Sequence, residues 1–426
     1  MKSGNHLDHW IFVFLFISSM AVRLAIGIGF INPFDLVPYN IPWAVGVYEN
    51  GFSMYKALDH LDYPPLFPSL LGLVGKGVKA AQAGEYWHLL MGWIKLVPIL
   101  GDGILMICVY AAARKTMPRL ACVIAGFVGL CGAFLVNSAF WGQADSWMLC
   151  FVFLMVWKLE ERCPKQAAVF FALGCLTKLQ TGYFAPFLLL ILFFEYPFKK
   201  AVSAVLLGGA VGLLGWLPFW IASGRLWLPF EIYFGGFGSY PYQNLNAFNL
   251  YGLWGRNWVL DSQTWIGNIT YAQLSGGITL LFAAGVPLFC CILTQRTGRT
   301  ILPSACGFLM MNGIFLFACR MHERYQLPAV ICALAAFLFT KQRAYLFLFF
   351  GVSTVSFFNQ VLLLFAMNYK EPFYSFFYQL QPWLSAVNLG LFLIQFVVFV
   401  SKNTNSFEIL RKIPGLGKSR GYKTIQ

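Results

Sequence analysis

Charged side chains are scarce in this sequence of 426 residues. They make up 11% of it, while hydrophobic residues make up 59%. A soluble domain carries roughly 25% charged residues, so the composition excludes an ordinary soluble protein. Apolar runs of about 20 residues recur, which is the length that a helix needs to cross a bilayer. Short alternating strands of the kind found in membrane barrels are absent from the pattern. The sequence therefore predicts an all-α polytopic membrane protein.

Acidic residues are the scarcer sign of charge. There are 16 Asp and Glu against 30 Lys and Arg, which gives a net charge of +14. A basic surplus can indicate nucleic-acid binding, but this chain has no compact basic domain. Basic loops on the cytoplasmic side of membrane helices explain the surplus better. We therefore predict contact with membrane lipids and no nucleic-acid partner.

Metal-binding and disulfide patterns are also missing. Nearly all of the 11 cysteines fall inside apolar runs, without the spacing of a disulfide framework or a zinc site. No HxH or HExxH motif accompanies the histidines. We predict no cofactor, and the question of a divalent metal stays open. No small-residue cleavage site follows the first apolar run, which predicts a retained helix rather than a signal peptide.

Twelve apolar runs are predicted to span the membrane. They cover residues 10–32, 89–113, 120–139, 147–159, 166–179, 183–197, 201–222, 272–294, 300–319, 327–340, 344–367 and 382–401. Residues 65–80 are shorter and contain Lys76 and Lys79, which predicts an interfacial helix within a long first outer loop. Most basic residues then fall on one side, so both termini are predicted to be cytoplasmic. Residues 1–401 form the membrane domain and residues 402–426 a basic cytoplasmic tail.

Two acids of the first outer loop are candidates for chemistry. Asp35 lies just beyond the first helix in "INPFDLVPYNIPWA", among apolar and aromatic neighbours. A carboxylate held there can take a proton from a hydroxyl, as a general base does. Asp62 precedes a Tyr-Pro-Pro sequence, where a turn contact or a helix cap is an equally good explanation.

The stretch "NSAFWGQADS", residues 137–146, interrupts the apolar sequence between the third and fourth predicted helices. Gln143 and Asp145 offer an amide and a carboxylate near Asn137, a combination suited to sugar hydroxyls. The alternative is structural, because Asp145 can cap the next helix and Trp141 and Gln143 can be interfacial residues.

Cationic residues occur in two segments predicted near the same face. Lys178 lies in "GCLTKLQTGYFAPF", where an ammonium group near hydrocarbon needs an anionic partner or a function. Arg324 lies in "CRMHERYQLPA", and its planar fork suits phosphate, although a pair with Glu323 is the alternative. His322 alone is more simply structural. In the second helix, Asp102 is predicted to be structural and the role of Lys95 is left open.

These segments together resemble a known family. The motifs are "WAVGVYENGFSMY" and "DYPPL" after Asp35, then "NSAFWGQADS", "CLTKLQ", "LNAFNLYGLWG" and "RMHERYQLPA". In this order, over about residues 10–340, the chain resembles bacterial relatives of the PIG-V-type GPI mannosyltransferases, which belong to the GT-C class of glycosyltransferases. Many relatives have Gly-Asp where this chain has Phe34-Asp35, and the lysine motif usually has proline in place of Leu179.

The resemblance implies a GT-C-type fold in the plasma membrane with its site facing outside. It implies a polyprenyl-phosphate-sugar donor, with mannose favoured, and a glycan or glycolipid acceptor. Asp35 matches the catalytic base of the family, and Lys178, Arg324 and His322 are expected to bind the donor phosphate. Sugar or acceptor contacts are expected from Asp62, Gln143, Asp145, Asn246 and Asn249.

The predicted reaction is an inverting transfer of a hexose. A lipid phosphate is already a good leaving group, so one base and stabilising cations suffice. Two other classes remain as alternatives: a secondary transporter or lipid flippase, and a non-catalytic subunit of a glycan-assembly complex. Transporters place polar groups near the midplane of repeated helices, whereas here they are predicted at one interface.

Overall fold

The computed structural model describes residues 3–238, 240–297 and 302–403, and nearly all secondary structure in these residues is helical. The predicted all-α class is therefore confirmed. The basic tail predicted at 402–426 falls almost wholly on residues 404–426, which lie outside the described residues. All eleven cysteines are free thiols, as the lack of a disulfide pattern predicted.

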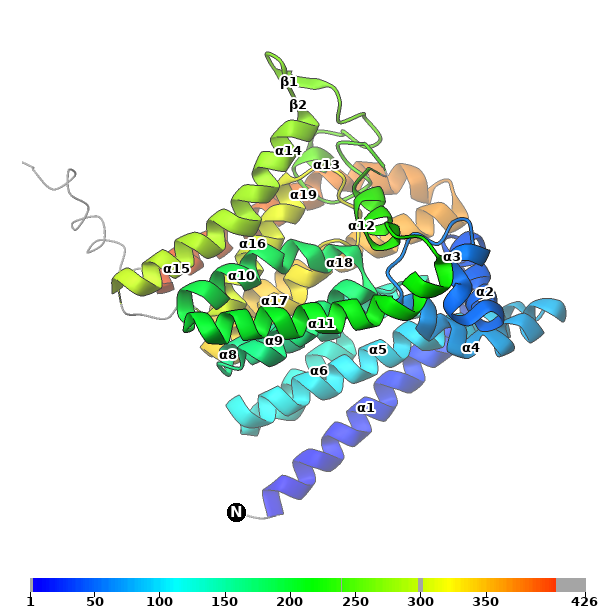
Figure 1. The fold of residues 1–426 in the computed structure, drawn as a ribbon, viewed down its shortest axis with the longest axis horizontal. Coiled ribbons are helices and arrows are strands. Elements are labelled where there is room, and N and C mark those ends of the chain that lie inside the picture. Colours follow the sequence, from blue (N-terminus) through cyan, green and yellow to red (C-terminus); the bar gives the residue numbers. More distant parts are fainter. Residues whose placement is uncertain (1–2, 239, 298–301, 404–426) are drawn as a thin grey trace, which may run out of the picture.

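Every predicted membrane run corresponds to a helix or to two helices in succession. In chain order these are α1 (Ser3–Gly29), α5 (Trp87–Thr116), α6 (Ala121–Leu130) with α7 (Gly132–Leu135), α8 (Asp145–Glu160), α9 (Pro164–Thr177), α10 (Phe184–Glu195), α11 (Phe198–Ser223), α14 (Tyr271–Leu280) with α15 (Val286–Thr297), α16 (Pro303–Phe317), α17 (Leu327–Thr340), α18 (Arg343–Tyr369) and α19 (Phe373–Asn403). Several of them, including α5, α6, α9 and α11, run along the long axis of the molecule (Figure 1).

Six of these helical segments are long and apolar enough to cross a membrane, within the described residues. They are α1, α5, α11, α14 with α15, α18 and α19, and a seventh is obtained if the bent pair Pro118–Leu130 and Gly132–Trp141 forms one span. The remaining predicted spans are shorter helices. The protein is thus a multi-pass membrane protein with six or seven candidate spans.

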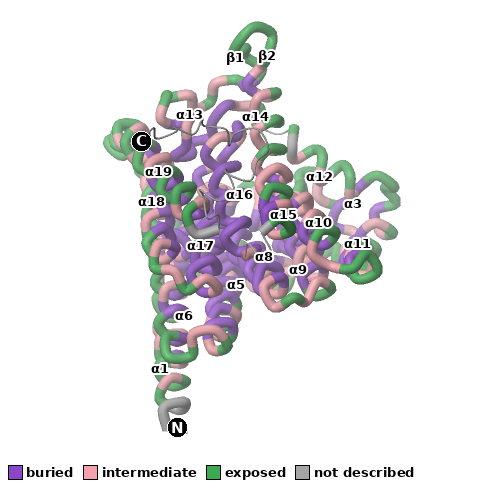
Figure 2. Tube along the Cα trace, turned by 90° about the vertical axis from the view of Figure 1, so that its left-hand side faces the viewer, coloured by how far each residue is buried: buried purple, intermediate pink, exposed green. Residues whose placement is uncertain are grey.

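Burial separates central helices from peripheral ones. Nearly every residue of α16 and α17 is buried, and Figure 2 shows these two helices within the purple interior. In contrast, α1, α11 and α19 expose large apolar side chains such as Phe14, Leu214 and Trp383. Exposed apolar faces on long helices suit contact with lipid, because hydrocarbon does not penalise them.

The long loop between α1 and α5 contains short helices at one end of the bundle (Figure 1). They are α2 (Ile41–Asn50), α3 (Met54–Ala57) and α4 (Leu66–Ala83), so the helix predicted at 65–80 is confirmed. A Cβ atom at Gly75 would lie 2.3 Å from the Ala44 carbonyl oxygen. The glycine thus allows α4 to pack against the backbone of α2, as small residues do at close helix crossings.

The long loop between α11 and α14 folds over the same end of the bundle. It contains α12 (Leu228–Gly238), α13 (Leu250–Leu253) and a small hairpin of β1 (Thr264–Ile266) and β2 (Ile269–Thr270). Its extended part lies beside the loop that joins α16 and α17. Arg320 N donates to the Tyr242 carbonyl oxygen at 3.0 Å, and Leu245 N donates to the Met321 carbonyl oxygen at 3.1 Å. Two motif-bearing loops far apart in sequence are therefore held together.

Candidate active site

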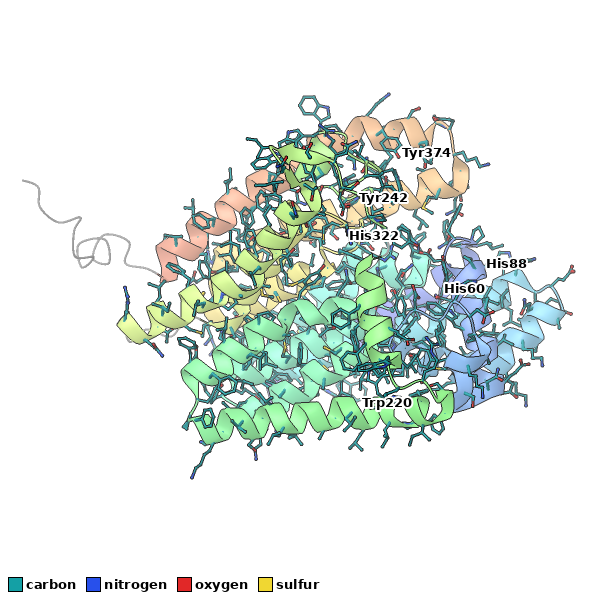
Figure 3. All side chains as sticks on the ribbon, turned by 45° about the horizontal axis from the view of Figure 1, so that its top comes forward. His60, His88, Trp220, Tyr242, His322 and Tyr374 are labelled. Carbon is teal, nitrogen blue, oxygen red and sulfur yellow. The ribbon has the colours of Figure 1, made fainter. Side chains whose placement is uncertain are left out.

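A cavity of about 280 Å³ lies where these loops meet the ends of the helices. Figure 3 shows His322, one of its lining residues, close to Tyr242 at this end of the bundle. Seven of the nine predicted site residues line it. They are Asp35, Asp62, Gln143, Lys178, Asn246, His322 and Arg324.

Asp35 is fixed by the hairpin at residues 137–146. Trp141 Nε1 donates to Asp35 Oδ2 at 3.0 Å, and Gln143 Nε2 donates to the same oxygen at 2.6 Å. No described residue donates a hydrogen bond to Asp35 Oδ1. The backbone of Asp35 has φ 60°, a left-handed value that Asp tolerates better than most residues. The carboxylate is thus oriented through one oxygen, and the other can accept a proton.

The hairpin itself depends on a left-handed glycine. A π-helical turn, Val136–Trp141, ends at Gly142, which has φ 82°. A Cβ there would lie 2.9 Å from the Leu36 side chain. Asn40 Nδ2 donates to the Gly142 carbonyl oxygen at 3.0 Å. The loop between α1 and α5 therefore holds the hairpin directly against Asp35.

Asp145 lies behind the cavity wall rather than in it. Its side chain is fully buried, and its Oδ1 accepts from Lys178 Nζ at 2.6 Å. Its Oδ2 accepts from Asn137 Nδ2 at 3.1 Å. Asp145 is the first residue of α8, after the N-cap residue Ala144, and its side chain accepts from Lys178 and Asn137. Asp145, which was expected to contact the sugar, is therefore not among the residues that line the cavity, and its carboxylate pairs with Lys178.

Arg324 and Glu323 extend this arrangement. Arg324 Nη1 donates to Glu323 Oε1 at 2.5 Å, and Arg324 Nε lies 4.0 Å from Asp145 Oδ2. The alternative Glu323–Arg324 pair is therefore present, and Arg324 also lines the cavity. We call Asp145, Lys178, Glu323 and Arg324 the Lys178 cluster.

Charge in the Lys178 cluster shifts the neighbouring ionisable groups. Burial alone raises the pKa of Glu323, but Arg324 and His322 outweigh it and lower that pKa to about 2. Burial lowers the pKa of His322, against an opposing effect of Glu323. Burial likewise opposes the charge of Arg324, yet Glu323 and then Asp35 raise its pKa well above the ordinary value. At neutral pH the site therefore contains a neutral imidazole and a guanidinium that interacts with the Asp35 carboxylate.

Asn246 and Asn249, in the loop between α11 and α14, differ in their position relative to the cavity. Asn246 lines the cavity, has φ 63°, and has a buried Oδ1 without a hydrogen-bond partner. Asn249 is fully buried and is not a lining residue. Its Oδ1 accepts from Gly252 N at 2.9 Å to cap α13, and its Nδ2 donates to the Phe315 carbonyl oxygen. The structure thus does not bring Asn249 to the cavity, since both of its polar atoms serve the fold.

Asp62 lines the cavity, as do Tyr63 and Pro64, which follow it in the chain. Burial raises the pKa of Asp62, and its carboxylate forms no ion pair with any described residue. A ligand in the cavity can therefore contact the Asp62 side chain.

Several lining residues were missed in the sequence. Besides Trp141, seven aromatic side chains line the cavity, and aromatic enrichment near a membrane interface gave no reason to separate them from ordinary interfacial residues. They are Tyr39, Trp43, Tyr63, Phe67, Tyr240, Trp258 and Tyr325. Gln180 also lines the cavity, with a buried and unpartnered Oε1. Its signal was its place two residues after Lys178.

A second buried charged group was also missed. Arg23 of α1 pairs with Asp102 of α5 at 2.8 Å, and both side chains are 1% exposed. Ser138 Oγ and Ser146 Oγ each donate to Asp102 at 2.6 Å. We call these residues, with Ser19, the Arg23 cluster. The prediction that Asp102 is structural agrees with this pairing, and an arginine inside an apolar run was the available signal.

Lys95, whose role was left open, is fully buried on α5. Its Nζ donates to the Phe30 carbonyl oxygen at 2.6 Å, at the end of α1. Its side chain also lies against Gly142, where a Cβ would be 3.3 Å from Lys95 Cγ. Lys95 therefore contacts both the segment that leads from α1 to Asp35 and the hairpin that donates to Asp35.

No protein-family model matches the sequence, and no curated protein matches it. Among the described residues, no group of three or more His, Cys, Asp or Glu side chains is arranged to hold a metal ion. Functional inference therefore depends on the residues of the cavity.

Proposed function

We propose that the protein is an inverting glycosyltransferase of the GT-C class that transfers a hexose, with mannose favoured, from a polyprenyl-phosphate-sugar to a glycan or glycolipid acceptor. One observation carries the proposal: the cavity brings the oriented carboxylate of Asp35 together with two cations, Lys178 and Arg324. A base and phosphate-binding cations are the two elements that this reaction requires.

The proposed step is a single displacement. Asp35 Oδ1 takes the proton of an acceptor hydroxyl while the acceptor oxygen forms a bond to the anomeric carbon. The bond between that carbon and the phosphate oxygen breaks, and the lipid phosphate leaves with the electron pair. Lys178 has three N–H donors and Asp145 accepts one of them, so it can also donate to the departing phosphate. One displacement inverts the anomeric centre, in contrast to the two displacements of a retaining enzyme.

A groove beside the cavity supports a lipid-linked donor. It has a volume of about 540 Å³, is lined by α9, α10, α11 and α12, and is almost entirely apolar. Leu176 lines the groove, while Lys178 lines the cavity. Leu179 lines the cavity and packs on α12, where a Cβ at Gly236 would lie 2.3 Å from Leu179 Cδ1. An isoprenoid in this groove places its phosphate at the next residues of the chain, beside Lys178.

The proposal includes the topology of twelve crossings with both termini cytoplasmic, α4 at the interface, and the cavity on the outer side of the plasma membrane. The shorter helices, such as α16 and α17, then cross within the bundle, where other helices rather than lipid surround them. The basic residues of the short loops support this orientation.

The test is sugar transfer in detergent from synthetic polyprenyl-phosphate carriers of mannose, glucose, galactose and N-acetylglucosamine to a bacterial glycolipid extract. We expect one carrier to be used, and Asp35→Asn to lower turnover by about 10²–10⁴-fold. Glu49→Gln is the matched control, because Glu49 is an exposed acid of the same loop that pairs with Lys79.

Two results would contradict the proposal. Turnover of Asp35→Asn within a few-fold of wild type removes Asp35 from the role of base. A wild-type protein that binds a carrier but transfers none of the four sugars favours the non-catalytic subunit instead.

A further inference from the structure

Two neighbouring amides in α18 lie beneath the cavity. Leu363 and Met367 of this helix line the cavity, and Asn359 and Gln360 precede Leu363 by about one helical turn. Both amide side chains are fully buried. Leaving a buried amide unpaired is costly, so their partners show what the two residues hold in place.

Asn359 clamps the loop that carries Asn246. Its Nδ2 donates to the Asn246 carbonyl oxygen at 2.8 Å, and its Oδ1 accepts from Phe248 N at 2.7 Å. Asn246 has the left-handed φ of 63°, which Asn adopts more readily than most residues. The clamp thus fixes both sides of Ala247 and holds the unpartnered amide of Asn246 at the cavity.

Gln360 supports the opposite side of the site. Its Oε1 accepts from Asn137 Nδ2 at 3.2 Å, and its Nε2 donates to the Ala133 carbonyl oxygen at 3.3 Å. Asn137 Nδ2 also donates to Asp145, the partner of Lys178.

The backbone of Asn137 continues this support toward the proposed base. The Asn137 carbonyl oxygen accepts from Gln143 N at 3.0 Å, and Gln143 Nε2 donates to Asp35. One asparagine therefore connects Gln360 both to the proposed base and to the proposed phosphate site.

We propose that Asn359 and Gln360 are positioning residues that set the relative placement of the two walls of the site. Asn359 holds the wall that contacts the sugar or acceptor through Asn246, and Gln360 holds the wall that contains the base and Asp145, the ion-pair partner of Lys178. The catalytic part of this inference rests on the proposed function, whereas the mechanical part does not. Misplacement of reacting groups by about 1 Å can cost about 10²-fold in rate.

The test measures local opening and turnover in the same variants. Hydrogen–deuterium exchange in detergent is followed for residues 241–260 and 132–146 in Asn359→Ala and Gln360→Leu. We expect faster exchange in 241–260 alone for the first variant and in 132–146 alone for the second. We also expect kcat to fall about tenfold or more in each, with a smaller change in the KM for the donor.

Conservative variants and a matched control complete the test. Asn359→Asp keeps an acceptor for Phe248 N but loses the donor to Asn246, so its kcat should lie between those of wild type and Asn359→Ala. Asn368→Ala is the control, because Asn368 is also on α18 but donates to the Leu364 carbonyl oxygen of its own helix; neither segment should open.

Each outcome decides between the alternatives. Unchanged exchange in both segments, or equal loosening throughout the chain, overturns the positioning roles. The expected exchange pattern in a protein without transferase activity leaves the positioning in place and refutes the proposed function. Sugar transfer by the wild type without the exchange pattern refutes the positioning alone.

Discussion

The Arg23 cluster and the Lys178 cluster both bury charge inside the helix bundle, yet they differ in what surrounds the charge. In the Arg23 cluster, Asp102 accepts one arginine and two serine hydrogen bonds, and Arg23 also donates to Ser19 and to the Gly129 carbonyl oxygen. In the Lys178 cluster, Lys178 and Arg324 line a cavity, and Arg324 Nε donates no hydrogen bond.

The difference distinguishes a structural ion pair from a candidate binding site. A buried pair repays its desolvation only when its remaining donors and acceptors are also satisfied. The Arg23 cluster meets this condition with protein groups alone. In the Lys178 cluster, both cations line a space large enough for a ligand, and Arg324 Nε has no hydrogen-bond partner among the described residues, so protein groups alone do not satisfy this cluster.

The hairpin at residues 137–146 belongs to both clusters. Ser138 and Ser146 donate to Asp102, whereas Asn137 contacts Asp145. Adjacent residues thus face opposite sides, one toward the structural pair and one toward the site. This arrangement explains why an otherwise apolar region contains so many small polar side chains.

The largest expected effect comes from breaking the Arg23 cluster. Asp102→Leu leaves the Arg23 guanidinium buried without its counterion, which should lower the free energy of unfolding by about 3–5 kcal/mol. The thermal midpoint in detergent measures this loss, and the double variant Arg23→Met with Asp102→Leu should recover most of it. A single variant as stable as wild type would show that the pair is not structural.

In the Lys178 cluster, a substitution is expected to cost less stability but to weaken donor binding clearly. In Lys178→Met, Asp145 keeps its bond from Asn137 and has Arg324 within 4.0 Å, so the cost should be only about 1–2 kcal/mol. Affinity for the polyprenyl-phosphate donor should fall about 10–100-fold, since one charge-assisted contact is lost. Donor affinity is measured by equilibrium binding in detergent. If it were unchanged, the Lys178 cluster would be a structural ion pair like the Arg23 cluster and not a binding site.

A pH effect should distinguish Glu323. Its pKa in the folded protein is about 2, below the ordinary value of about 4.3, so its carboxylate stabilises the fold fully above about pH 5. This contribution should be lost as the pH falls from there through about 2. Thermal midpoints of wild type and Glu323→Gln should therefore converge on acidification, with the variant less stable at neutral pH. Parallel curves from pH 6 to pH 3 would contradict the assignment.

The smallest effect is expected at an exposed pair. Lys79 and Glu49 lie 2.6 Å apart, with side chains 58% and 43% exposed. Because water screens such pairs, Lys79→Gln should leave the thermal midpoint in detergent unchanged within the error of the measurement. A change as large as that of Lys178→Met would mean that burial does not control the cost of losing an ion pair in this protein.

The sequence was sufficient for the helices and for seven of the residues that line the cavity. Hydrophobic runs identify helices in a membrane protein because their backbone must be satisfied internally, and Asp35, Lys178 and Arg324 stood out as polar residues beside those runs. Pairing was harder to predict. Whether Asp145 contacts a ligand or Lys178 depends on the distance between α8 and the end of α9, which no local pattern encodes.

The amides of α18 show the same limit more clearly. Asn359 and Gln360 lie in the last part of the chain, where the sequence contained no motif for the site. Their importance comes from contacts with residues more than 100 positions away, such as Asn246 and Asn137. A single buried amide in an apolar helix predicts that a partner exists but does not identify it.

The brevity of α16 and α17 has a consequence for access to the site. With 15 and 14 residues, each is only about 22 Å long, whereas the hydrocarbon layer is about 30 Å thick. Neither helix is therefore long enough by itself to cover that layer. Under the proposed function, the loop between them, which carries His322 and Arg324, would meet a lipid-linked donor within the depth of the bilayer, so the head group would not have to leave the membrane to reach Arg324.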